Sequence, residues 1–138
     1  MRKILHFIML TCLSLTAFAI DFTENHHLLF IFSSHCPHCH NQAPILKACA
    51  QNKHFKIEAY SLDNQGFPDF PDAQIPADDL LMTAFSGQSI QTPAIFILNT
   101  ETLALYPLAI GEVSFEELEQ RIQDLSSKVL TFENGGVS

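Results

Sequence analysis

The sequence has 138 residues, with 15 acidic against 7 basic residues and a formal net charge of −8. An acidic chain without a basic cluster argues against nucleic acids or anionic membrane surfaces as partners. The length fits one domain with a single modest core.

The first 19 residues have the pattern of a secretory signal peptide. Arg2 and Lys3 give a positive start, residues 4–18 are mostly apolar, and Ala17-Phe18-Ala19 matches a small-x-small cleavage site. The apolar run is short for a membrane span, although an uncleaved anchor is the alternative. We therefore predict export to the periplasm, with cleavage near Ala19.

Three of the four cysteines lie beyond this segment. An odd number of cysteines does not suit a framework of structural disulfides. It fits one redox-active pair plus one spare thiol better. Cys36 and Cys39 have the C-x-x-C spacing of such a pair. Cys49 is then the spare thiol, which we expect to be buried.

The cysteine pair stands between a predicted strand and a predicted helix. Leu28–Ser33 is a continuous apolar run, as in a strand buried on both faces. A helix should begin at Cys36-Pro37, because proline fits a first helical turn, and Pro44 should bend it. Phe55–Leu62 alternates like a second strand, so the three elements predict a βαβ unit with parallel strands.

Residues 63–76 are rich in proline and predict a loop. The apolar side chains of Phe67, Phe70 and Ile75 within it either tuck back onto the domain or contact a partner. The pattern after the loop predicts a short helix, two antiparallel strands and an amphipathic last helix, at residues 78–87, 94–98, 103–110 and 115–125.

The last predicted helix has a clear start signal. Ser114 is a favourable N-cap, and Glu117 three residues later completes a capping box. Residues 131–138 are predicted to be a flexible tail. The folded domain is therefore expected to span residues 20–130.

The chemistry of a C-x-x-C pair at a helix start is thiol–disulfide exchange. A thiol attacks as its thiolate, and the N-terminus of a helix stabilises an anion. We therefore predict that Cys36 is the nucleophile and that Cys39, about one turn later, is the resolving thiol. His38 between them, with His35 and His40 beside them, would stabilise the thiolate and make the disulfide more oxidising.

The same stretch matches other kinds of site. Residues 36–40 read C-x-x-C-H, the c-type haem attachment motif, for which Met82 would be a distal ligand. A structural disulfide is another alternative. A zinc or copper chaperone is the main alternative function, and its ligands would be His35, Cys36, His38, Cys39 and His40.

A C-x-x-C motif at a strand–helix junction, followed by Thr92-Pro93 before a later strand, resembles the thioredoxin superfamily. The resemblance implies an α/β thioredoxin fold, with a central mixed sheet of about four strands flanked by helices. It also implies a cis bond at Thr92-Pro93, facing the dithiol. Substrate backbone would pair beside these two residues, which we take as the substrate-binding residues.

Three further stretches resemble the TrbB-like thiol-disulfide isomerases of F-type conjugation systems. They are Ser61-Leu62-Asp63, Gly66–Ala73 and Thr92-Pro93-Ala94. The Cys-Pro-His-Cys motif is similar to that of the periplasmic oxidase DsbA. The resemblance implies an exported thiol–disulfide oxidoreductase or isomerase that acts on exported cysteine-containing proteins. It also suggests that these substrates belong to conjugation or pilus assembly.

One position departs from the thioredoxin pattern. Many members carry a buried carboxylate six residues before the first cysteine, where this chain has Phe30. Another group would then accept the proton of Cys39, and Glu58 on the neighbouring strand and water are the candidates. We expect no organic cofactor and no metal, a monomer, and a membrane or periplasmic redox partner.

Overall fold

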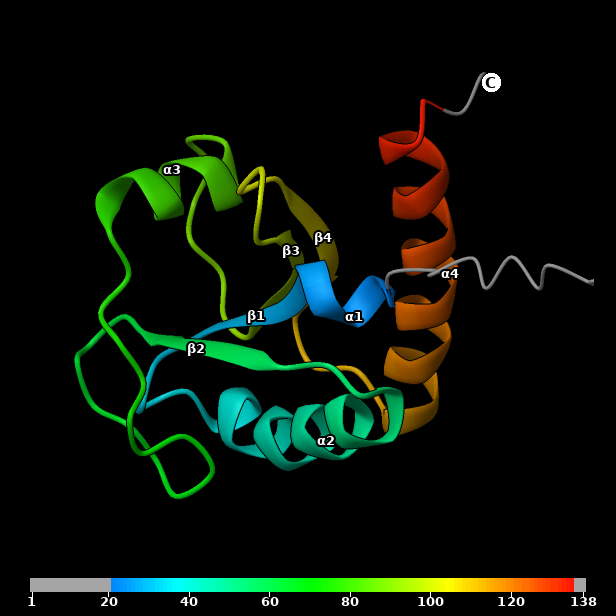
Figure 1. The fold of residues 1–138 in the computed structure, drawn as a ribbon. Coiled ribbons are helices and arrows are strands. Elements are labelled where there is room, and N and C mark those ends of the chain that lie inside the picture. Colours follow the sequence, from blue (N-terminus) through cyan, green and yellow to red (C-terminus); the bar gives the residue numbers. More distant parts are fainter. Residues whose placement is uncertain (1–20, 136–138) are drawn as a thin grey trace, which may run out of the picture.

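A computed structural model describes residues 21–135 (Figure 1). The predicted signal peptide lies outside the described residues. The helices are α1 (Phe22–Asn25), α2 (Pro37–Lys53), α3 (Asp78–Phe85) and α4 (Phe115–Glu133), and the strands are β1 (His26–Phe32), β2 (Ile57–Ser61), β3 (Ala94–Asn99) and β4 (Leu105–Ile110). None of the helices in this range is long and apolar enough to cross a membrane.

The four strands form one mixed sheet in the order β2-β1-β3-β4. Strands β1 and β2 are parallel, with Leu28 opposite Ile57 and Phe32 opposite Ser61. The β1–β3 and β3–β4 pairs are antiparallel. The predicted α/β fold with a four-stranded mixed sheet is therefore confirmed, including the βαβ unit that carries the two cysteines.

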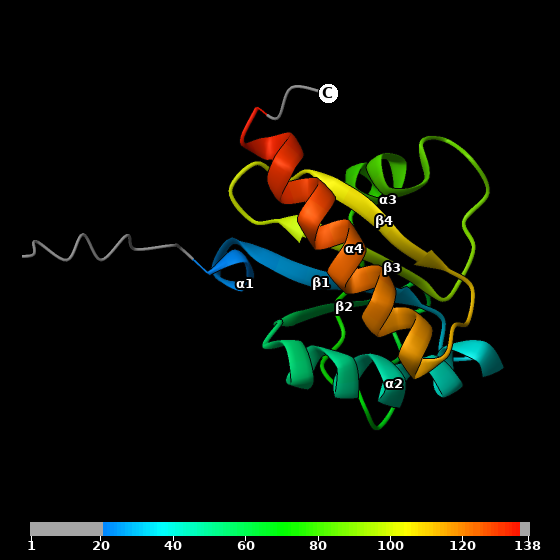
Figure 2. The same cartoon turned by 90° about the vertical axis from the view of Figure 1, so that its right-hand side faces the viewer.

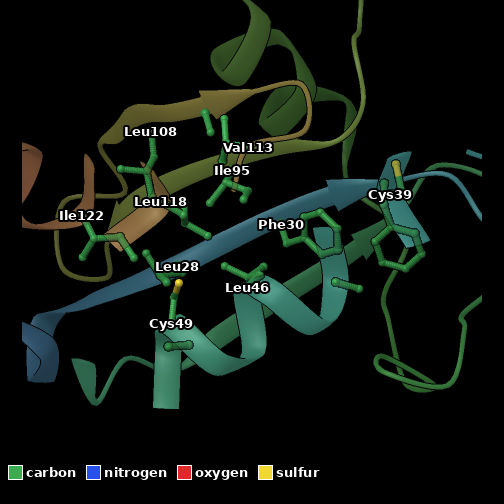
Figure 3. Close-up of a cluster of buried hydrophobic side chains, with 14 of the residues drawn as sticks. Leu28, Phe30, Cys39, Leu46, Cys49, Ile95, Leu108, Val113, Leu118 and Ile122 are labelled. Carbon is green, nitrogen blue, oxygen red and sulfur yellow. The ribbon is translucent and has the colours of Figure 1, made fainter. Parts of the chain in front are cut away.

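Helices cover both faces of the sheet. Figures 1 and 2 show α2 and α4 on one side and α3 on the other. Successive side chains of a strand point to opposite faces, so Phe30 and Phe32 pack against α2 and α4, while Leu29 and Ile31 pack on the α3 side. The larger core therefore lies beneath α2, the helix that begins beside the dithiol (Figure 3).

Helix α2 starts at Pro37 and continues to Lys53, with Pro44 inside it. Cys36 is its N-cap, and the Cys36 sulfur accepts a hydrogen bond from the backbone N–H of Cys39. The helix therefore passes through Pro44 without ending there, and its first turn is fixed by the nucleophile predicted from the sequence.

The loop after β2 folds back onto the α2 side of the core. The ring of Phe67 lies 4.2 Å from that of Phe32, and the ring of Phe70 lies 5.4 Å from that of Phe30. Ile75 stays 60% exposed. A Cβ on Gly66 would lie 2.6 Å from the carbonyl oxygen of Phe70, so this turn requires glycine. Two of the three apolar loop residues thus belong to the fold.

Helix α4 begins as the capping box predicts, because the Ser114 hydroxyl accepts a hydrogen bond from the backbone N–H of Glu117. It ends later than expected, at Glu133, so the first three residues of the predicted tail are helical. The reason is a set of hydrogen bonds near its end: the Glu133 carboxylate accepts from Asn99, Tyr106 and His26 at 2.8–2.9 Å.

Both edges of the sheet are poorly suited to accept another strand. On the β2 edge, the backbone of Gln74 bonds to Ser61 and Ala59 at 2.8 and 3.1 Å. On the β4 edge, Pro107 has no N–H to offer, and proline within a sheet occurs at such edges.

Candidate active site at the Cys36–Cys39 dithiol

The two cysteines have different environments. Cys36 is half-buried at the start of α2, whereas Cys39 is fully buried one turn later. Both are free thiols, near disulfide distance from each other. This arrangement leaves Cys36 accessible to a partner molecule and keeps Cys39 behind it.

Burial, together with the hydrogen bond to the Cys36 side chain, raises the pKa of the Cys39 thiol to about 12. Cys39 therefore holds its proton at neutral pH. As a resolving thiol it becomes reactive only when that proton is transferred to another group.

The Thr92–Pro93 peptide bond is cis, as the sequence pattern predicted. The Cys36 thiol donates a long hydrogen bond of 3.8 Å to the Thr92 carbonyl oxygen. The structure thus brings Thr92 and Pro93 directly against Cys36, although 56 residues separate Thr92 from Cys36 in the sequence.

Each of the three histidines near the dithiol has a separate partner. His38 Nδ1 lies 2.6 Å from Glu112 Oε2, and His40 Nε2 lies 2.7 Å from the Ser34 carbonyl oxygen. His35 is only loosely paired, 3.8 Å from Asp63. The His38 side chain is 71% exposed, and its partner is the Glu112 carboxylate. The predicted stabilisation of the Cys36 thiolate by His38 would therefore involve Glu112 as well.

Asp63 fixes the turn that leads from β1 into the dithiol. Its carboxylate accepts hydrogen bonds from the Ser34 hydroxyl at 2.5 Å, the Ser34 backbone N–H at 3.1 Å and the Ser61 hydroxyl at 2.7 Å. The Ser34 and Ser61 hydroxyls hold the pKa of Asp63 well below its usual range. Asp63 is therefore an ionised anchor for the residues just before Cys36.

Asp63→Asn is expected to remove part of the acid sensitivity of the fold. The folded-state pKa of Asp63 is below the unfolded value of about 3.9, so the unfolded state binds more protons as the pH falls. Its stabilisation is complete above about pH 4 and disappears at lower pH. In urea unfolding, the difference between wild type and variant should shrink on acidification. Asp72→Asn, an exposed position, is the control; a constant difference for Asp63→Asn would contradict the prediction.

A family model described as "TraF: F plasmid transfer operon protein" matches residues 18–123. The chain belongs to the TraF family. Protein TrbB of Escherichia coli (strain K12) is 37% identical over 84 residues, which are 61% of this chain and 46% of TrbB. The chain thus matches about half the length of this curated relative.

Solved structures agree with the fold of this TraF-family protein. A thiol:disulfide interchange protein of the thioredoxin family from Chlorobium tepidum TLS superposes with a TM-score of 0.57 at 11% identity, covering 76% of this chain and 82% of that one. StoA from Bacillus subtilis gives 0.50 at 18% identity, covering 71% and 82%. The chain is therefore a TraF-family protein with a thioredoxin fold, and it is similar to TrbB over part of its length.

The predicted role of Glu58 in this TraF-family protein is wrong on geometric grounds. Glu58 is paired with Leu29, and paired residues of neighbouring strands share a face of the sheet. Leu29 packs on the α3 side, whereas Cys39 packs on the α2 side. Glu58 instead hydrogen-bonds to His27 at 2.7 Å. It cannot take the Cys39 proton directly across the sheet.

The metal and haem alternatives gain no support from the structure. Among residues 21–135, no three histidine, cysteine, aspartate or glutamate side chains are grouped to hold a metal ion. Met82, the suggested haem ligand, is 66% exposed on α3, across the sheet from the C-x-x-C motif.

Two residues of the TraF-family site were missed in the sequence. Glu112 lies 74 positions after its partner His38, and nothing local marks it. Gln42 is fully buried on α2, and its side-chain oxygen accepts a hydrogen bond of 2.7 Å from the Val113 backbone N–H. A glutamine three residues after Cys39, among the apolar positions of a helix, was the available signal.

Proposed function

We propose that this protein is an exported thiol–disulfide oxidoreductase that exchanges disulfides with cysteine-containing proteins. The observation that supports it best is the pairing of a half-exposed Cys36 at a helix N-terminus with a buried Cys39, opposite a cis Thr92–Pro93 bond. Cys36 is the N-cap of α2, and its sulfur accepts a hydrogen bond from the backbone N–H of Cys39, so the attacking atom is at the exposed start of the helix.

In the first step, the Cys36 thiolate attacks one sulfur of a substrate disulfide. The bond between Cys36 and that sulfur forms, the substrate disulfide breaks, and the other substrate sulfur leaves as a thiolate. No net oxidation has occurred at this point, since one disulfide has replaced another.

The mixed disulfide then has two fates. Cys39 loses its proton to water or to the released substrate thiolate and attacks Cys36. The substrate leaves as a dithiol, reduced by two electrons, and the protein keeps the Cys36–Cys39 disulfide. Alternatively, a second substrate thiolate displaces Cys36, which isomerises the substrate without changing the protein. In the reverse of the first route, the Cys36–Cys39 disulfide oxidises two substrate thiols to a disulfide and is itself reduced.

The setting of this activity is also part of the proposal. The signal-peptide pattern of residues 1–19 supports a periplasmic location, where disulfides persist. The family supports substrates among exported proteins of conjugative transfer. We further propose that the protein is a monomer and needs no organic cofactor. A periplasmic or membrane redox partner would return its cysteine pair to the starting redox state.

A trapping experiment tests this function. Cys39→Ala leaves the nucleophile but removes the resolving thiol, so mixed disulfides with substrates should accumulate in the periplasm of a conjugation-proficient host. Non-reducing gels would show adducts that disappear on reduction. Cys36→Ala/Cys39→Ala is the matched control and should give none. Absence of adducts with Cys39→Ala, together with no catalysis of ribonuclease refolding by the wild type, would refute the proposal.

A further inference from the structure

A groove lies beside the dithiol on the side of the cis bond. It encloses about 570 Å³ and is lined by His38, Thr92, Pro93, Gly111, Glu112, Val113 and Ser114. Because the Thr92 carbonyl oxygen is 3.8 Å from the Cys36 sulfur, a chain whose sulfur reacts with Cys36 lies beside this groove. We call it the Pro93 groove.

Glu112 is held in this groove by the backbone of the residues on either side of it. The N–H of Gly111 donates to the Pro93 carbonyl oxygen at 2.8 Å, and the N–H of Val113 donates to the buried Gln42 at 2.7 Å. Gly111 has φ of +94°, a conformation that favours glycine. The carboxylate is therefore carried by a turn that is tied on one side to the cis-proline strand and on the other to the dithiol helix.

The charge of Glu112 is poorly compensated within the protein. Of the residues lining the Pro93 groove, Glu112 is the acidic one, and in the described part of the chain its ion-pair partner is His38, itself 71% exposed. Pairs between exposed groups are weak and readily exchanged. A permanently charged side chain of a bound substrate could replace or join His38.

We infer that the Pro93 groove selects substrates with an arginine or lysine next to the reacting cysteine, and that Glu112 makes this selection. An arginine guanidinium fits a carboxylate with two parallel hydrogen bonds, which favours arginine over lysine. The inference rests on the proposed function, because it concerns the substrate that Cys36 attacks. Glu112 would act on the bound chain and leave the sulfur chemistry to Cys36.

Short peptides with one cysteine, supplied as mixed disulfides with thionitrobenzoate, test the inference. The residue next to the cysteine is arginine, glutamine or glutamate, and release of thionitrobenzoate gives the rate constant for attack by Cys36. For the full-length wild type we expect arginine to react about two- to five-fold faster than glutamine, the range of an exposed ion pair. Glutamate should be slower than glutamine.

Variants of Glu112 separate a local effect from the net charge. Glu112→Gln should bring the arginine-to-glutamine ratio close to one, and Glu112→Lys should invert the order of the charged peptides. Glu101→Gln makes the same charge change in the turn after β3, at the end of the sheet away from the dithiol, and should keep the wild-type ratio.

The outcomes separate this inference from the function it rests on. If the glutamine peptide reacts but flanking charge has no effect, or if Glu112→Gln keeps the arginine preference, the inference is wrong and the oxidoreductase function stands. If Glu101→Gln lowers the ratio as much as Glu112→Gln, net charge explains it and the inference is also wrong. If no peptide reacts with the wild type, the proposed function fails, and the inference fails with it.

Discussion

Cys36→Ser is expected to reduce thiol–disulfide exchange to the rate seen without protein. A serine hydroxyl cannot form the mixed disulfide through which exchange proceeds. The remaining thiols cannot replace it, because Cys39 is buried behind it, and burial likewise raises the pKa of Cys49 to about 11. Reduction of insulin disulfides by dithiothreitol, followed by turbidity, measures the loss.

Cys49→Ala is the matched control for this prediction. Cys49 lies toward the other end of α2 from Cys39, within the core (Figure 3). Its removal should lower stability modestly and leave the exchange rate per folded molecule unchanged. Circular dichroism should show that both variants are folded. Exchange that survives in Cys36→Ser would mean that another thiol carries the activity.

Phe30→Ala is expected to cost about 3–5 kcal/mol of unfolding free energy. Phe30 is fully buried on the central strand β1, with its ring 5.2 Å from that of Phe32 and 5.4 Å from that of Phe70. Truncation would leave a cavity between the sheet, α2 and the loop that follows β2. Urea unfolding of the two proteins gives the difference.

The control for this variant is Phe132→Ala. Phe132 is 73% exposed on α4, so the same chemical change should alter the free energy of unfolding by about 0.5 kcal/mol or less. A loss of under 1 kcal/mol for Phe30→Ala would show that the core relaxes around the missing ring.

The strand that carries Phe30 belongs to the part of the fold that the sequence predicted well. An uninterrupted apolar run, a C-x-x-C motif and a second strand are local signals, and together they placed β1, α2 and β2 close to their observed positions. The Ser114 cap was found for the same reason, since its partner is three residues away. These interactions form between near neighbours, so spacing alone reveals them.

The interactions that shape the site were harder to predict, because they join distant segments. Glu58 was wrongly predicted as a proton acceptor for Cys39 because the alternation of a strand separates two faces but does not say which helix covers each face. The pairing of Glu58 with Leu29 shows which face carries Glu58. The His38–Glu112 contact likewise depends on how the turn before α4 packs against α2. The end of α4 was misplaced because Glu133 is held by Asn99 and Tyr106, which lie on other elements.

The two edges of the sheet, poorly suited to accept another strand, have a consequence when a substrate of the proposed exchange arrives as an unfolded chain. Such chains carry unpaired backbone groups and add readily to any open strand. Here Gln74 occupies the outer side of β2, and Pro107 interrupts the row of donors on β4. Extended substrate chains therefore have few strand edges to pair with on this molecule. Non-productive binding away from the sulfur atoms is disfavoured.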